Sequence, residues 1–469
     1  MLTAFTAAAI VVSVAVTIYF LLWNVSQLLM SPVAALYVWR HQQLHTPRAR
    51  AVVGQIAAQP LVSIVVPAFN EELTIVESVR ALLALDYEAR EIVVVNDGSA
   101  DGTLAALSRA FQLTQAPLAF DQPIKTAPVH GIYRSIAEPE LVVVDKENGR
   151  SKADASNAGI NAASGVLVLI IDADTVLEPD ALSRAVVPFL EDPTTVAVGS
   201  NVALTNGCRI EQGRITKAAL PRSWFARFQV VEYMRSFLLF RLVCAAANAV
   251  VLISGAFGLF RRDALIAIGG YDPTAIGEDM DLTVRLQEHF RARRQPIRIA
   301  FDPHPLGWTQ APEDLRSLRG QRWRWRRGLL QVLWRHRHMI GSRRYGTVSL
   351  GALPYIVLFE GAAPLIEVVG FSIAGAAALL GVLNWRYFIV MVAASALLGT
   401  AVTLIALVLS DVATGRSQRG RELALLIVVA LIESFGYRQL NSWWGFVGTV
   451  RALRGRGGWG VITRRAFES

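Results

Sequence analysis

The feature that most constrains this chain is a continuous apolar run that ends in two carboxylates. Residues 166–175 read VLVLIIDADT, so Asp172 and Asp174 follow the run two positions apart. An apolar run of strand length without polar alternation indicates a strand that is buried on both faces, as in a parallel sheet covered by helices. Ligands of such sheets bind beyond the carboxyl ends of the strands, where these aspartates fall.

The two aspartates suit a divalent cation. Side chains at positions i and i+2 of an extended segment point the same way, so both carboxylates can converge on one ion. Mg²⁺ or Mn²⁺ held by one or two carboxylates together with substrate phosphates is the usual arrangement at such a point. A lone pair of this kind is also typical of an acidic turn after a strand, and the rest of the sequence decides between the two.

The two ends of the chain carry an excess of apolar residues, and hydrophobic residues make up 53% of the whole. No charged side chain precedes Arg40, and a bilayer span needs about 20 apolar residues. Residues 1–40 are therefore predicted to be a transmembrane anchor, with a span near residues 4–30 that Pro32 ends. A cleaved signal peptide would have a basic start and a shorter apolar run.

A second apolar region, predicted to be transmembrane, covers residues 346–450, and a basic tail covers residues 451–469. Three spans in this region would place the tail outside, whereas its five arginines favour the cytoplasm. The conflict disappears if the shorter apolar stretch 350–359 joins a fourth span, or if one segment does not cross. The three longer apolar segments are residues 362–380, 387–409 and 423–447.

The net charge of +9 comes mainly from arginines that flank the apolar segments. This placement is typical of a bacterial-type inner-membrane, multi-pass protein whose basic parts lie in the cytoplasm. No basic, aromatic-interleaved motif accompanies the charge, so nucleic acid is not an expected partner. Two cysteines without a pairing pattern, Cys208 and Cys244, indicate neither a disulfide framework nor a zinc site.

Between the apolar ends, residues 41–345 have ordinary globular composition and read as strand–turn–helix units. Apolar strands are predicted at 62–67, 91–95 and 141–144, and a helix is predicted from Lys152, just before the strand that ends in the two aspartates. This alternation predicts a doubly wound α/β domain. The second strand ends in Asn96-Asp97-Gly98-Ser99, which suits close ligand approach and is also ordinary turn chemistry.

Four segments stand out in order along the domain: VSIVVPAFNEE, VVVNDGSADGT, KADASN at 152–157 and DADT. Together they resemble the GT-A domain of family 2 glycosyltransferases. Three later segments are SGAFG at 254–258, GED at 277–279 and QRWRW at 321–325, which matches QxxRW. These three narrow the resemblance to the membrane-embedded branch that contains the cellulose, hyaluronan, chitin-oligosaccharide and poly-N-acetylglucosamine synthases.

The resemblance implies an α/β, Rossmann-like GT-A catalytic domain in the cytoplasm, flanked by transmembrane helices, and a UDP-sugar donor. It assigns Asp172 and Asp174 to the Mg²⁺ or Mn²⁺ ion that supports the diphosphate. Asp97 would contact the uracil or ribose edge of the donor, Lys152 the nucleotide or phosphate, and Arg324 the diphosphate.

The same resemblance assigns the acceptor side. Asp279, with Glu278 beside it, matches the position of the general base, although acids at this point are also favourable at any helix N-terminus. A carboxylate is a weak base, so burial would have to raise its pKa. One base without a second nucleophile implies a single displacement with inversion, which gives a β-linked product. Gln321, Trp325 and Phe257 are assigned to acceptor binding.

Two further helices are predicted at the membrane surface, residues 223–243 and 313–338, and the first suits a buried core helix nearly as well. The expected function is a processive polymerase that makes a β-linked polysaccharide and extrudes it. The alternative is transfer of one sugar to a lipid acceptor, and a transporter or scaffold with a degenerate domain is disfavoured by the intact acids. Expected partners are the donor, a growing glycan or lipid acceptor and membrane lipid, with accessory subunits or a homo-oligomer also compatible.

Overall fold

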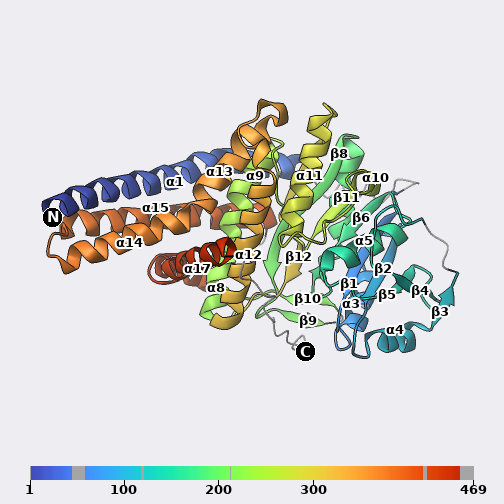
Figure 1. Cartoon of the computed structure of the whole chain (residues 1–469). Coiled ribbons are helices and arrows are strands. Elements are labelled where there is room, and N and C mark those ends of the chain that lie inside the picture. The colour runs from blue at the N-terminus through green and yellow to red at the C-terminus, as the bar shows by residue number, and fades with distance from the viewer. Residues whose placement is uncertain (1, 45–58, 118–120, 212, 416–419, 455–469) are drawn as a thin grey trace.

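The computed structural model describes residues 2–44, 59–117, 121–211, 213–415 and 420–454. An α/β domain lies at one end, and long helices extend from it to the N-terminus at the far end (Figure 1). Most of the predicted basic tail, residues 455–469, lies outside the described residues.

The domain is built on a ten-stranded sheet with the order β3-β4-β5-β2-β1-β6-β11-β8-β12-β7. Its centre confirms the strands predicted from the apolar runs: β5 (Leu141–Lys146), β2 (Arg90–Asp97), β1 (Val62–Ala68) and β6 (Leu167–Ile170) are parallel neighbours. Neighbouring residues of β1 belong to separate core clusters, Ile64 to one and Val65 to the other, so the strand is buried on both faces.

The sheet is mixed rather than wholly parallel. β11 (Gly258–Arg261) runs antiparallel to both β6 and β8 (Thr195–Leu204), and β8 pairs in parallel with β12 (Arg298–Thr309). The remaining strands are β3 (Leu113–Ala116), β4 (Val129–Ser135), β7 (Val176–Leu177) and the separate hairpin of β9 (Arg209–Glu211) and β10 (Arg214–Lys217).

Helices cover the sheet, and the parallel strands end in turns at its carboxyl edge. Those that matter for the site are α5 (Lys152–Ala162), α11 (Glu278–Ala292) and α12 (Leu315–Arg335). The others in the domain are α3 (Ile75–Leu83), α4 (Thr103–Phe111), α6 (Ala181–Ala185), α7 (Val187–Glu191) and α10 (Arg262–Ala267).

The predicted end of the first helix at Pro32 is wrong, because α1 runs without a break from Leu2 to Leu44. Proline cannot donate the backbone hydrogen bond that the carbonyl four residues earlier would accept. Here Ser31 Oγ donates to that carbonyl, Leu28 O, at 2.7 Å and satisfies it. At about 1.5 Å per residue the helix is roughly 65 Å long, about twice the thickness of a bilayer's hydrocarbon core.

The part of α1 beyond Pro32 docks on the α/β domain. Ala34 and Val38 are fully buried in a cluster that contains Phe301 of β12. Tyr37 Oη donates to Phe301 O at 2.8 Å. This tertiary packing stabilises the helix through the proline, which the local sequence does not indicate.

Within the described residues, three helices are long and apolar enough to cross a membrane: Thr3–Gln43, Val348–Leu379 and Trp385–Thr414. The stretch 350–359 is thus part of one helical run with the segment that follows it. A fourth candidate is a pair bent by 52°, α16 (Gly420–Glu433) and α17 (Tyr437–Leu453). The span Val348–Leu379 contains α13 (Leu353–Tyr355) and α14 (Ala363–Leu379), and the span Trp385–Thr414 is α15.

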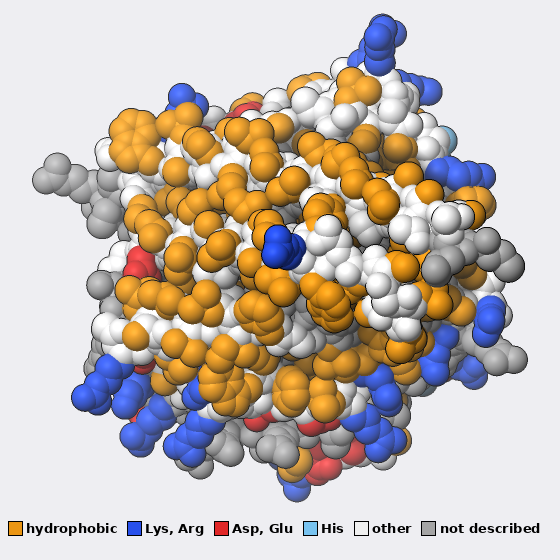
Figure 2. Space-filling model, turned by 90° about the vertical axis from the view of Figure 1, so that its left-hand side faces the viewer, with side chains coloured by type: hydrophobic (Ala, Val, Ile, Leu, Met, Phe, Trp, Pro, Cys, Tyr) orange, Lys and Arg blue, Asp and Glu red, His pale blue; other side chains and the backbone are white. Residues whose placement is uncertain are grey.

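Hydrophobic side chains cover the face seen from the bundle end, and Lys and Arg lie mainly around its rim (Figure 2). Large apolar residues there are well exposed, such as Ile10 of α1, Leu379 of α14 and Leu397 of α15. A contiguous apolar surface of this size marks contact with a membrane or another protein. The helices that form this surface have the length of membrane spans.

The segment predicted as the first surface helix lies between the sheet and the bundle. α8 (Trp224–Arg235) continues through a π-helical turn (Ser236–Arg241) into α9 (Leu242–Ala246). Its residue Leu238 is fully buried in one cluster with Phe301 of the sheet and Ala406 of α15. The centre of this segment is therefore buried, as expected for a core helix.

Candidate active site

The aspartate pair lies just beyond the carboxyl end of β6. Burial, and then the charge of Asp172, raise the pKa of Asp174 to about 6. A cation between the carboxylates would relieve this repulsion. Among the described residues no group of three or more His, Cys, Asp and Glu side chains could hold a metal by itself. Two carboxylates completed by substrate oxygens nevertheless fit the way in which Mg²⁺ binds.

Lys152 bridges the two acidic parts of the site. It opens α5, whose N-terminus is capped by Ser151 Oγ accepting from Asp154 N at 3.2 Å. Lys152 Nζ lies 2.6 Å from Asp172 Oδ1 and donates to Gly255 O at 3.3 Å. Burial favours the neutral amine, but the charges of Asp172, Asp279 and Glu278 outweigh it and raise the pKa of Lys152, which stays cationic.

Asp279 lies in the first turn of α11, next to Glu278. Burial, and then the charge of Glu278, raise the pKa of Asp279 to about 7. The backbone at Gly255 passes between Asp279 and Lys152. A Cβ at Gly255 would lie 2.6 Å from Asp279 Oδ2 and 3.0 Å from Lys152 Nζ, so any side chain here would disrupt the arrangement. The structure thus brings both predicted acidic motifs to one place.

Asp97, at the end of β2, is held by a lysine that the sequence analysis missed. Lys146 Nζ donates to Asp97 Oδ1 at 2.6 Å and lies 2.7 Å from Asp154 Oδ2. Lys146 is fully buried and opposite Asp97 in the β2–β5 pairing. A buried charge needs ionic partners. The sequence signal was a lysine at the end of the strand LVVVDK, one residue beyond the apolar run.

The QRWRW motif lies on α12, whose first turn is capped by Asp314 Oδ1 accepting from Ser317 N at 2.9 Å. Arg324 is close enough to Glu278 to lower that residue's pKa, although burial dominates and raises it. The Trp325 side chain is 42% exposed, and its ring centroid lies 6.3 Å from that of Tyr233. Gln321 Oε1 is buried and has no hydrogen-bond partner in the described part of the chain.

Phe257 differs from the other predicted acceptor residues. Its side chain is fully buried in the cluster on one face of the sheet. It follows the backbone turn at Gly255 and has no surface to offer a ligand in this arrangement. We therefore leave Phe257 out of the proposed acceptor contacts.

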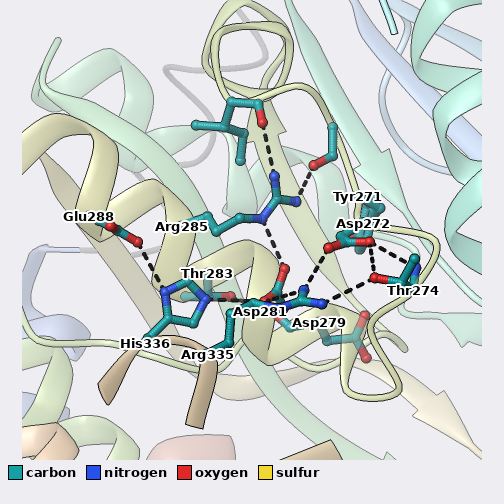
Figure 3. A network of polar contacts seen from close by, with 12 residues as sticks. Tyr271, Asp272, Thr274, Asp279, Asp281, Thr283, Arg285, Glu288, Arg335 and His336 are labelled. Atoms are coloured by element: carbon teal, nitrogen blue, oxygen red, sulfur yellow. Dashed lines mark hydrogen bonds and ion pairs between the residues drawn. The ribbon is translucent and has the colours of Figure 1, made fainter. Parts of the chain in front are cut away.

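Asp281 lies two residues after Asp279 but is enclosed by cations (Figure 3). Its Oδ2 accepts from Arg285 Nε at 2.9 Å, and its Oδ1 lies 3.1 Å from His336 Nε2 and 3.2 Å from Arg335 Nη1. Burial would raise the pKa of Asp281, but the hydrogen bond with His336 and the nearby guanidinium groups lower it. Asp281 is thus a fixed anion rather than a candidate base.

Two protein-family models match this chain, and together they cover the candidate site and part of the apolar C-terminal region. The family model described as glycosyl transferase family 2 matches residues 63–269. The model described as glycosyl transferase family group 2 matches residues 167–412, which is more than half of the chain. The second match spans both acidic motifs and the QRWRW helix.

Two relatives are described as poly-beta-1,6-N-acetyl-D-glucosamine synthases. The Staphylococcus aureus (strain COL) protein is 29% identical over 300 residues, and the Staphylococcus epidermidis protein is 28% identical over 300 residues. Each match covers 64% of this chain and 60% of the relative, so this chain spans less than two thirds of the length of these relatives.

Among solved structures, this chain is similar in fold to the mannosyltransferase PcManGT from Pyrobaculum calidifontis, determined in complex with GDP-Man and Mn²⁺. The TM-score is 0.54 at 19% sequence identity, over 94% of this chain and 99% of that one. This likeness confirms the predicted fold, a glycosyltransferase α/β domain with flanking apolar helices. With a family model that covers more than half of its length, the chain belongs to the family 2 glycosyltransferases.

Proposed function

We propose that this protein is an inverting glycosyltransferase that uses a UDP-sugar to build a β-linked polysaccharide and passes it across the membrane. The observation that carries the proposal is the meeting of Asp279, Lys152 and Asp172 around Gly255, beside the QRWRW helix. The relatives named as poly-β-1,6-N-acetylglucosamine synthases favour an N-acetylglucosamine polymer of this class.

In the proposed reaction Asp279 accepts the proton of the acceptor hydroxyl. The hydroxyl oxygen forms a bond to the anomeric carbon of the donor while the bond from that carbon to the diphosphate oxygen breaks. The electron pair of that bond leaves with UDP, and attack from the opposite side inverts the anomeric centre. A pKa of about 7 suits the role, because a general base works best when its pKa lies near the working pH.

The leaving diphosphate is stabilised by cations. Asp172 and Asp174 would hold Mg²⁺ or Mn²⁺, which would neutralise the charge that develops on the diphosphate. Lys152 and Arg324 approach the acidic residues of the site and can turn toward a bound diphosphate as further positive charges. Asp97, fixed by Lys146, would contact the uracil or ribose of the donor.

The acceptor would bind along α12. The exposed ring of Trp325 offers an apolar face to a sugar, and the unpaired buried oxygen of Gln321 can accept a hydrogen bond. A lipid acceptor that receives one sugar is the alternative, and the named activity of the relatives favours the polymer.

The deciding experiment incubates protein purified in detergent with UDP-N-acetylglucosamine, other UDP-sugars or GDP-mannose, with Mg²⁺ or Mn²⁺. We expect UDP release with UDP-N-acetylglucosamine and products that a sizing gel resolves as long chains. A single-sugar product on a lipid would support the alternative, and no release from any donor would contradict both.

We also propose that the catalytic domain and the tail are cytoplasmic. α16 and α17 meet at a bend of 52°, where Gly436 has φ +99°. α17 also stays with the domain, since Thr449 Oγ1 accepts from Arg326 Nε of α12 at 2.8 Å. If this bent pair does not cross the membrane, the tail arginines stay inside, as the positive-inside rule favours.

The topology predicts that a cysteine placed at Ser469 will not react with an impermeant reagent added to intact cells. The same cysteine should react after the cells are opened, which serves as the control for its accessibility. Labelling from outside would show instead that the bent pair crosses the membrane.

A further inference from the structure

We propose that Gly328, Gln331 and Arg335 form a positioning face on α12 that fixes the acceptor-side motif relative to Asp279. The inference rests on the proposed function. Counted from Arg324, these residues follow at spacings of four, three and four, so all lie on one side of the helix. Their partners belong to the loop 271–277, which leads into Glu278 and Asp279, and Arg335 also contacts Asp281 of α11.

The first contact is between two backbones. A Cβ at Gly328 would lie 2.9 Å from both Cα and N of Gly277, the residue that directly precedes Glu278. Real Cβ contacts are not this short, so even alanine at Gly328 would force α12 and the loop apart. The two glycines allow the helix that carries Arg324 to touch the start of α11.

The second contact uses both ends of one amide. Gln331 Oε1 accepts from Ile276 N at 2.8 Å, and Gln331 Nε2 donates to Thr274 O at 3.0 Å. These bonds satisfy two backbone groups of the loop that no strand or helix partner serves. A side chain of different length would not reach both.

The third contact is ionic (Figure 3). Arg335 Nη1 lies 2.6 Å from Asp272 Oδ2 and 3.2 Å from Asp281 Oδ1, and its Nη2 donates to Thr274 Oγ1 at 3.1 Å. Arg335 therefore joins the start of the loop to the fixed anion of α11. From the other side of the domain, Asn157 of α5 donates to the loop at Tyr271 O, at 2.8 Å.

The position of α12 along its own axis matters for the reaction. A shift by one residue moves an α-helix by about 1.5 Å and turns its side chains by about 100°. A misplacement of about 1 Å can cost roughly 10²-fold in rate. None of the three contacts involves a group assigned to substrate, so these are positioning residues that act through the loop and Asp279.

Arg335→Gln is the main variant, and Arg335→Lys is the conservative one. We expect Arg335→Gln to lower kcat at least ~10-fold with the donor KM within about 3-fold, and Arg335→Lys to restore part of the loss. The matched control is Arg337→Gln, because Arg337 contacts Trp334 on its own turn, at 2.8 Å from Nη1 to Trp334 O. It should keep the wild-type kcat.

A double variant that combines Arg335→Gln with Asp279→Asn distinguishes an effect through the base from a merely structural role. If Arg335 acts through the base, Arg335→Gln should add little to the loss that Asp279→Asn already causes. Independent losses that multiply would overturn the proposal. Gln331→Leu tests the same face without removing a charge from Asp281, should Arg335→Gln fail to fold.

Hydrogen exchange of residues 271–277 gives a readout that needs no turnover. Arg335→Gln and Gln331→Leu should each speed amide exchange in this loop roughly 10-fold. The first removes the contacts with Asp272 and Thr274, and the second removes the acceptor of Ile276 N. Exchange that matches wild type in both variants would overturn the positioning face. Faster exchange in a protein that transfers sugar from no donor would support the contacts and contradict the proposed function.

Discussion

Asp279 and Asp281 lie two residues apart in the first turn of α11, the first partly buried and the second fully buried, and their surroundings give them opposite properties. Burial and Glu278 raise the pKa of Asp279 to about 7. Burial acts on Asp281 in the same direction, but His336, Arg285 and Arg335 outweigh it and lower its pKa. The number of cationic partners thus suits one carboxylate to the proposed role of base and makes the other a structural anion.

The largest effect is expected from Asp279→Asn. Asparagine keeps the shape of the side chain but cannot accept the acceptor proton, and general-base catalysis contributes about 10²- to 10⁴-fold. The transfer rate should fall that far while UDP affinity stays near wild type. Loss of UDP affinity with turnover retained at saturating donor would instead make Asp279 a binding residue.

Asp174→Asn should come next, lowering transfer about 10²- to 10³-fold and weakening UDP binding in the presence of Mg²⁺ or Mn²⁺. The reason is the loss of one of two carboxylates that would hold the ion at the diphosphate. The measurement is UDP affinity with the metal and with EDTA. Full activity of the wild type in EDTA would show that the metal assignment is wrong.

A smaller effect, on stability, separates the two aspartates of α11. The folded-state pKa of Asp279 lies above the ordinary value of about 3.9, so its stabilising contribution is present below pH ~4 and is lost as pH rises through about 7. Asp279→Asn should therefore raise the free energy of unfolding at pH 8 by ~1–3 kcal/mol, without metal or donor.

Asp281 should show the opposite sign. Its pKa is lowered, so its contribution is present above the ordinary value and is lost as pH falls below it. Asp281→Asn should lower the free energy of unfolding at pH 8 by about 3 kcal/mol, because Arg285 and Arg335 lose their buried anionic partner and His336 loses a hydrogen bond. Thermal unfolding of both variants at pH 8 and pH 5 checks the pair. If both substitutions lowered the free energy of unfolding at pH 8, the proposed difference between Asp279 and Asp281 would be wrong.

The central sheet could be predicted from sequence because its strands are continuous apolar runs, as in VSIVVP of β1 and VLVLII of β6. The course of α1 through Pro32 could not, because the helix is stabilised by Ala34 and Val38 packing against β12 far along the chain. Similarly, the antiparallel insertion of β11 beside β6 depends on long-range pairing that no local pattern encodes.

The acidic motifs could be picked out from sequence because Asp172 and Asp174 follow a buried strand and Glu278 and Asp279 begin a helix, although both positions also suit ordinary structural acids. The partners of the acidic residues could not be predicted. Lys146 reads as an ordinary strand end, and its buried contact with Asp97 spans 49 positions. Arg335 and His336 read as part of a basic surface helix, and their partner Asp281 lies more than 50 positions earlier.

The pH dependence of transfer at saturating donor and Mg²⁺ tests the central claim most directly. With Asp279 as base and a pKa of about 7, kcat should rise nearly tenfold per unit below pH 7 and level off above it. The small residual rate of Asp279→Asn should lack this rise. A wild-type profile that is flat between about pH 5.5 and pH 8, or the same rise in Asp279→Asn, would contradict the account.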